Sequence, residues 1–147
     1  VDVYPTLCEL AGVTPPSFID GKSLVPVLKN TSAKINQYAF GQYNRGKING
    51  YSCRDSRYRL VEWIKDFRTY VPLSGRQIVG VELYDYETDP LETKNLANNP
   101  KFKSILEKMK KDLHLHFQKQ FEKSKQFGIN KLFPIANVNL DDIDNFM

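Results

Sequence analysis

The 147 residues of this chain have few of the features that mark membrane proteins, disulfide-bonded proteins and common enzyme classes. They contain no run of about 18 apolar residues, which excludes a membrane-spanning helix within them. Two cysteines are too few for a disulfide framework, so Cys8 and Cys53 are expected to be buried free thiols. A Gly-rich phosphate loop and an H-E-x-x-H zinc motif are also missing, so the sequence offers no recognisable phosphate or zinc site.

Residues suited to metal binding are equally scarce. The only two histidines, His114 and His116, would point about 200° apart on a helix and could not bind one metal ion. We expect His114 to face water and His116 to border an apolar stripe. The acidic residues Asp85, Asp89 and Glu92 lack the spacing of a calcium loop and are better explained as turn residues. We therefore expect no catalytic residue, metal site or cofactor in this chain.

What the chain does contain indicates a folded protein. Hydrophobic residues at 41% and aromatic residues at 12% exclude an intrinsically disordered chain. The net charge of +4 is modest for a nucleic-acid-binding protein, and we expect no nucleic-acid partner. An amphipathic pattern already runs at Val1, without a charged and then apolar leader before it. This start predicts that the chain is a piece cut from a larger protein.

The first 36 residues predict two short helices. Val3, Leu7 and Leu10 recur at helical spacing, and Gly12 suits a left-handed residue that ends the helix. This helix would have one apolar face and would be too short to fold alone, so it needs a partner surface. A further one or two helical turns are predicted over residues 23–28.

The rest of the chain predicts an α+β fold. Four strands are expected over residues 37–43, 48–54, 57–64 and 78–84. Their short connections require antiparallel neighbours, and residues 65–77 form a longer polar loop. Asn99 is an expected N-cap, with Pro100 in the first helical position and an apolar stripe running on to Phe121. The prediction is a four-stranded antiparallel sheet packed against a long C-terminal helix, which Gly128 would end.

One group of basic and aromatic residues suggests contact with an anion. It spans the expected second and third strands and the segment before them, and its members are Tyr43, Arg45, Lys47, Tyr51, Arg54, Arg57, Tyr58 and Arg59. The planar guanidinium of arginine can bind sulfate or phosphate through two parallel hydrogen bonds. Arg45 and Lys47 are favoured because they are expected on a loop.

Two stretches match a known family in the expected order. Residues 1–12 and 20–24 resemble the V-D-[IL]-[YF]-P-T-L-x-x-L-A-G and D-G-x-S-L segments of the sulfatase family, which is part of the alkaline-phosphatase-like superfamily. Residues 82–97 resemble the family's E-L-Y-D-x-x-x-D-P-x-E-x-x-N-L-A segment. The likeness is greatest to iduronate-2-sulfatase-like members and indicates the C-terminal portion of a sulfatase.

The resemblance implies a division of the chain and of the chemistry. Residues 1–36 would be the end of a large α/β domain that is otherwise missing, residues 37–127 the smaller C-terminal domain, and residues 128–147 an irregular tail. Sulfatases hydrolyse sulfate esters with a formylglycine made from the cysteine of C-x-P-S-R, assisted by calcium. Neither Cys8 nor Cys53 fits that motif, so this chain alone is expected to be inactive.

The resemblance also suggests a substrate and a place of action. The implied substrate is a sulfated sugar or glycosaminoglycan, and the implied location is secreted, lysosomal or periplasmic. Residues 42–45 resemble a stretch that iduronate-2-sulfatase-like enzymes place before a long insertion toward the substrate entrance, although only a few residues separate Arg45 from the next strand here. Tyr43, Arg45 and Lys47 are therefore candidate substrate-binding residues. The alternative is a freestanding module that binds a polyanion through Arg45, Lys47 and the lysine-rich helix, without catalysis.

Overall fold

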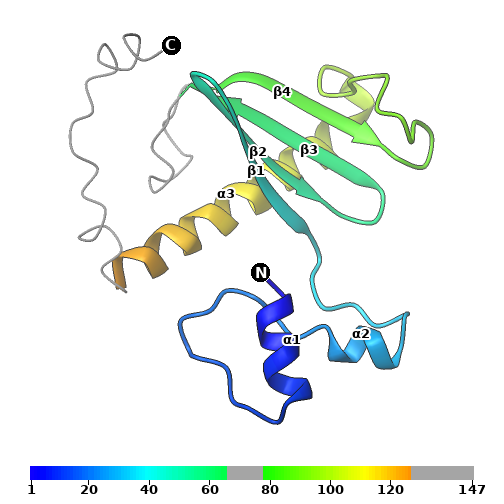
Figure 1. Cartoon of the computed structure of the whole chain (residues 1–147). Coiled ribbons are helices and arrows are strands. Elements are labelled where there is room, and N and C mark those ends of the chain that lie inside the picture. Colours follow the sequence, from blue (N-terminus) through cyan, green and yellow to red (C-terminus); the bar gives the residue numbers. More distant parts are fainter. Residues whose placement is uncertain (66–77, 127–147) are drawn as a thin grey trace. The chain divides into compact units, whose positions relative to one another are not determined.

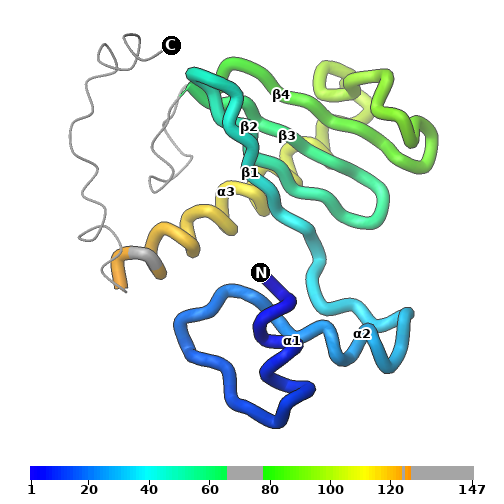
Figure 2. The backbone as a smooth tube through the Cα atoms, viewed as in Figure 1, coloured from blue at the N-terminus to red at the C-terminus, as the bar shows by residue number. Residues whose placement is uncertain are grey.

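The structure is a computed structural model that describes residues 1–65 and 78–126, and it divides into two compact units between Ala39 and Phe40 (Figures 1 and 2). The sequence placed a boundary slightly earlier, after residue 36. The polar loop expected after Lys65, the helix end expected at Gly128 and the irregular tail expected beyond it lie outside the described residues. No helix in the described ranges is long and apolar enough to cross a membrane.

The first unit contains two short helices, α1 (Val3–Leu10) and α2 (Val25–Lys29). Helix α1 ends as predicted, because Gly12 adopts a φ of 67°. The Gly12 amide donates to the Glu9 carbonyl at 3.1 Å, and the Val13 amide donates to the Cys8 carbonyl at 2.8 Å. These two bonds form a Schellman motif, which satisfies carbonyl groups that the end of a helix otherwise leaves unpaired.

Polar contacts attach α1 to the segment before α2. The Lys22 amide donates to Asp2 Oδ1 at 2.9 Å, and the Leu24 amide donates to Thr6 Oγ1 at 2.9 Å. The Thr6 hydroxyl itself donates to the Asp2 carbonyl at 2.5 Å. The side of α1 that is buried within this unit is therefore the side of Pro5 and Thr6.

The predicted apolar face of α1 remains exposed. Val3, Leu7 and Leu10 are 65%, 59% and 62% exposed. Apolar side chains at helical spacing that are left open in this way are typical of a surface that another structure covers.

The second unit contains the predicted four-stranded antiparallel sheet. Its strands are β1 (Ala39–Arg45), β2 (Ile48–Arg54), β3 (Tyr58–Ile64) and β4 (Ile78–Asp85), and they lie side by side in chain order (Figure 1). Strand β1 begins and ends two residues later than predicted. The reason is Gly46, whose φ of 57° allows a two-residue turn, so that pairing continues through Arg45.

The long helix forms as predicted and covers one face of this sheet. After a single turn η1 (Pro100–Phe102), capped by the Asn99 side chain on the Lys101 amide, the chain continues as α3 (Lys103–Gln126). The core between helix and sheet consists of the fully or almost fully buried Tyr51, Cys53, Leu60, Leu83, Leu106, Met109 and Leu113. The fold class predicted from the sequence is therefore confirmed.

The outer edge of β4 is covered by the chain that follows it. The Leu83 amide donates to Asn95 Oδ1 at 3.0 Å, and Asn95 Nδ2 donates to the Val81 carbonyl at 3.0 Å. The Leu96 amide also donates to the Leu83 carbonyl at 2.8 Å. These bonds occupy donor and acceptor groups that an open sheet edge would expose to other chains.

Gly21 offers a direct test of the first unit. A Cβ added there would lie 2.1 Å from the Val1 carbonyl oxygen, whereas one added at Gly12 meets nothing within 4 Å. We expect Gly21→Ala to detach the 20–24 segment from α1 and to abolish hydrogen-exchange protection of the Lys22 and Leu24 amides. Gly12→Ala, the control, should cost only about 1 kcal/mol through its left-handed backbone and keep both amides protected. Protection of both amides in Gly21→Ala would contradict this account.

Candidate functional site

The β1–β2 hairpin carries the three residues that the sequence proposed for substrate binding. Gly46 and Lys47 form its two-residue turn, Arg45 is the last residue of β1, and Tyr43 lies two residues before it. Tyr43 is 66% exposed, and Arg45 and Lys47 are also exposed. Asn44 Nδ2 donates to Asn49 Oδ1 at 3.0 Å across the hairpin, which holds the two strands in register.

The structure does not bring the five predicted cations together. Arg45 and Lys47 lie at one end of β2, whereas Arg54, Arg57 and Arg59 lie at the other end, about 20 Å away along a seven-residue strand. The aromatic members separate as well: Tyr51 is fully buried, and Tyr58 packs edge-on against Phe102 with the ring centroids 6.4 Å apart. The predicted strand over residues 48–54 already implied this separation, because an extended strand of seven residues holds its two ends apart.

The arginines at the far end are engaged in local structure. Arg57 donates Nε and Nη2 to the two carboxylate oxygens of Asp85 at 2.9 and 2.7 Å, and it also pairs with Glu87. The Arg57 hydrogen bonds lower the pKa of Asp85, which is almost fully buried. Arg59 pairs with Glu92, and Arg54 lies over the Tyr86 ring at 3.9 Å from its centroid.

The acidic segment after β4 does not fit a calcium ion. Asp85 is engaged by Arg57, and Glu92 by Arg59 and the Tyr86 hydroxyl. The carboxylate of Asp89 accepts the Lys94 amide at 2.8 Å and the Thr93 hydroxyl at 3.0 Å. Asp89 and Asp85, which also accepts the Glu87 amide at 3.1 Å, therefore stabilise turns as predicted, whereas Glu92 is engaged by side chains of other segments. Among the described residues, no three or more histidine, cysteine or acidic side chains are grouped so that they could hold a metal ion.

A buried carboxylate lies between the sheet and α3. Glu62 of β3 is fully buried, and its Oε2 lies 2.5 Å from His114 Nε2, with Lys110 Nζ 3.6 Å from its Oε1. The prediction that His114 faces water was wrong, because its Nε2 contacts the carboxyl group of Glu62. The sequence did not predict that Glu62 of the sheet would lie against this helix position. The other histidine, His116, stacks on Phe40 with the ring centroids 3.6 Å apart, consistent with its place beside the apolar stripe.

Cys53 is unsuited to nucleophilic chemistry. Its side chain is fully buried, and its thiol donates to the Met109 carbonyl at 3.7 Å. Burial, followed by the nearby Asp112 carboxylate, raises the pKa of Cys53 to about 12. The thiolate that a nucleophile requires is therefore almost absent at neutral pH.

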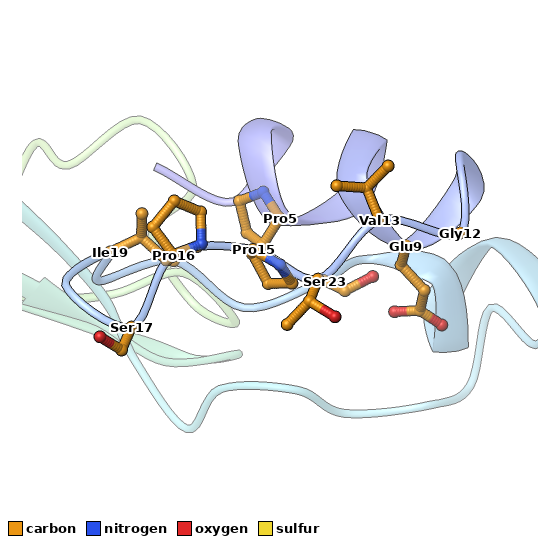
Figure 3. A pocket seen from close by; sticks show the side chains of 11 residues that line it. Pro5, Glu9, Gly12, Val13, Pro15, Pro16, Ser17, Ile19 and Ser23 are labelled. Carbon is orange, nitrogen blue, oxygen red and sulfur yellow. The ribbon is translucent and has the colours of Figure 1, made fainter.

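A groove in the first unit is a further candidate. It has a volume of about 630 Å³ and is lined by Pro5 and Glu9 of α1 and by the loop through Pro15 and Pro16 to Ser23 (Figure 3). Glu9 is the only ionisable residue of this lining. The lining therefore places no second acid, base or nucleophile beside the Glu9 carboxylate.

The comparisons with known proteins assign the chain to a family. The family described as N-sulphoglucosamine sulphohydrolase, C-terminal, matches residues 1–120. An ulvan-active sulfatase from Formosa agariphila is 33% identical over an alignment of 134 residues, gaps included, that covers 76% of this chain and 27% of that protein. A Δ4,5-hexuronate-2-O-sulfatase from Bacteroides thetaiotaomicron is 34% identical over 72% of this chain and 21% of its own length.

A vertebrate relative and a solved structure agree with these matches. Arylsulfatase K from Xenopus laevis is 30% identical over 94% of this chain and 28% of that protein. A solved protein in complex with its substrate D-glucosamine-2-N,6-O-disulfate superposes with a TM-score of 0.65 at 27% identity, covering 82% of this chain and 24% of that one. The chain thus spans about a quarter of the length of the relatives it matches.

The Glu62–His114 contact should contribute strongly to stability. His114→Ala leaves a fully buried carboxyl group with only Lys110 nearby, so we expect the free energy of unfolding to fall by about 2 kcal/mol, the penalty for a buried acceptor that has lost its partner. The control is Glu122→Ala, which removes the exposed pair with Lys125 and should cost about 0.5 kcal/mol or less. Urea unfolding followed by fluorescence measures both, and similar losses in the two variants would refute a special role for Glu62.

Proposed function

Because this chain belongs to the N-sulphoglucosamine sulphohydrolase C-terminal family, we propose that it forms the C-terminal part of a sulfatase that hydrolyses sulfate esters of a sulfated sugar. The observation that carries the proposal is the family match over residues 1–120. The resemblance to sulfatases predicted from two sequence motifs is confirmed by this match and by the sulfatase relatives. The closer likeness to iduronate-2-sulfatase-like members stays a prediction.

The proposal places the reaction itself outside this chain. Residues of both sequence motifs make contacts that stabilise the fold of this chain. In the first motif, Asp2 and Thr6 accept hydrogen bonds from amides of the first unit. In the second motif, Asp85 binds Arg57, and Asn95 covers the edge of β4. The formylglycine and the calcium ligands implied by the family resemblance would then come from a preceding part of the polypeptide. The resemblance also supports a secreted, lysosomal or periplasmic location.

The exposed face of α1 supports the existence of that preceding part. Val3, Leu7 and Leu10 are more than half exposed. Fully burying an aliphatic side chain of this kind contributes about 1.5–3 kcal/mol. In the proposal the missing sulfatase domain covers this face, and residues 1–36 belong to that domain rather than to the sheet and helix that follow.

The β1–β2 hairpin is the proposed contribution of this chain to substrate binding. Arg45 would bind a sulfate group through two parallel hydrogen bonds, Lys47 would add a second positive charge, and Tyr43 would contact the sugar. The relatives named for ulvan, for a hexuronate and for a glucosamine disulfate support a sulfated sugar as the substrate class. The exposure of all three side chains at one hairpin is the structural support.

The polyanion-binding alternative has less support. Two lysines of α3 already have acidic partners on the same helix, because Lys108 pairs with Asp112 and Lys125 with Glu122. The match to a sulfatase family also gives no reason to expect binding without catalysis.

The coding sequence upstream of Val1 tests the enzyme against the freestanding module. If the proposal is correct, that sequence continues in frame and encodes a C-x-P-S-R motif, because the nucleophile must be made from its cysteine. An in-frame start codon directly before Val1 would instead favour the freestanding module.

Substitution of Arg45 tests the hairpin in the intact sulfatase. Arg45→Ala should raise KM for a sulfated disaccharide by at least about tenfold, because it removes both hydrogen bonds to the sulfate group and one such bond to a charged group already contributes about 1.5–3 kcal/mol. Because Arg45 would stand away from the bond that breaks, kcat should change less than KM. Lys103→Ala removes an exposed cation at the start of α3 and should leave both constants unchanged. A large fall in kcat at unchanged KM would contradict a binding role.

A further inference from the structure

The tryptophan of β3 lies flat on the sheet because its two cross-strand neighbours are glycines. Trp63 is paired with Gly50 of β2 and with Gly80 of β4. A Cβ added at Gly50 would approach Trp63 Cζ3 to 2.8 Å, and one added at Gly80 would approach Cδ1 to 3.4 Å. The benzene ring of the indole therefore covers Gly50, and a side chain there would lift the ring off the sheet.

Hydrogen bonds fix the ring in this orientation. Trp63 Nε1 donates to Glu82 Oε1 at 2.8 Å, and the Tyr84 hydroxyl donates to Glu82 Oε2 at 3.2 Å. Trp63 is nevertheless partly exposed. A large aromatic surface that is already fixed loses little conformational entropy when a ligand packs on it.

Tyr43 and Arg45 lie on the same face of the sheet as Trp63. Ser52 Oγ donates to the Gly41 carbonyl at 3.4 Å, which sets Gly41 opposite Ser52 and therefore Tyr43 opposite Gly50. Phe40 of β1 stacks on His116 of α3 and therefore faces the helix. Because side chains alternate between the two faces of a strand, Tyr43 and Arg45 face away from the helix. Tyr43 and Trp63 thus flank Gly50 in one row, about 10 Å apart across two strand spacings.

The charge of this region favours an anionic ligand. Residues 39–53, which include β1 and the turn, contain Arg45 and Lys47 but no acidic residue. The one carboxylate bonded to the indole, Glu82, already accepts hydrogen bonds from Trp63 and Tyr84. A sulfated sugar has an apolar C–H face that can pack on an aromatic ring, and anionic groups at its edge that can bind arginine. The flat indole and the cations at the adjacent hairpin match these two parts.

We propose that Trp63 is a stacking platform for a sugar ring of the sulfated ligand, beside the hairpin that binds its sulfate. This inference rests on the proposed function and adds a second ligand-binding element, seated on Gly50 and Gly80. Glu82 is a positioning residue that holds the ring, and Tyr43 and Arg45 bind the adjoining part of the ligand. Trp63 therefore determines affinity for a sugar ring, whereas Arg45 determines affinity for sulfate.

The chain contains a single tryptophan, so its fluorescence reports on Trp63 alone. The whole 147-residue chain is titrated with D-glucosamine-2-N,6-O-disulfate, while inorganic sulfate and polyphosphate serve as anions without a sugar ring. We expect the sugar to change Trp63 emission saturably and the two ring-free anions to leave it unchanged. Calorimetry of the same titration should show affinity about tenfold weaker in Trp63→Ala, in line with the loss of one aromatic stacking contact.

Two further variants separate the platform from the charge and from folding. Gly50→Ala keeps the tryptophan but lifts it, so it should weaken sugar binding, whereas Tyr4→Ala, an exposed aromatic residue of α1, should not. Circular dichroism confirms that each variant folds. Equal fluorescence changes with polyphosphate, or no binding of the sugar, would overturn the platform. Sugar binding that Arg45→Ala abolishes but Trp63→Ala leaves unchanged would overturn it too, while preserving the proposed function of the hairpin.

Discussion

Helix α3 packs across one face of the four-stranded sheet, and the other features of the second unit follow from this contact. The helix contributes the buried Leu106, Met109 and Leu113 and packs on β2 and β3, where the Cys53 thiol donates to the Met109 carbonyl. The same contact takes Glu62 out of water, and His114 supplies the partner that a buried charge requires. The helix packs on one face of the sheet, and the proposed ligand-binding residues lie on the opposite face and at the hairpin end.

The segments that identify the family are structural in what they do within this chain. The side chains of Asp2 and Thr6 accept hydrogen bonds from the amides of Lys22 and Leu24. Gly21 leaves room for the Val1 carbonyl because it has no side chain. After β4, Asp85 fixes Arg57, while Asn95 covers the sheet edge. Such residues are constrained by hydrogen-bond geometry and backbone space. A shared motif therefore need not mark the place where the chemistry occurs.

The proposed ligand-binding residues share a different property, which is that the fold leaves them open or partly open. Tyr43 and Arg45 project from β1 on the face away from α3, and Trp63 is held flat on that face by two glycines and Glu82. Rigid strands position these side chains better than a loop would. A sugar-binding role for this face is compatible with a reaction centre supplied by another part of a sulfatase.

The sequence by itself determined the elements, several of their ends and the family. Gly12, Gly46 and the Asn99–Pro100 pair act through local backbone geometry, and an apolar stripe at helical spacing is visible without tertiary structure. Only the tertiary structure decided that His114 meets Glu62 and that Trp63 lies on Gly50 and Gly80. These facts depend on strand register and on which sheet face the helix covers, and both are set by contacts between residues far apart in the sequence.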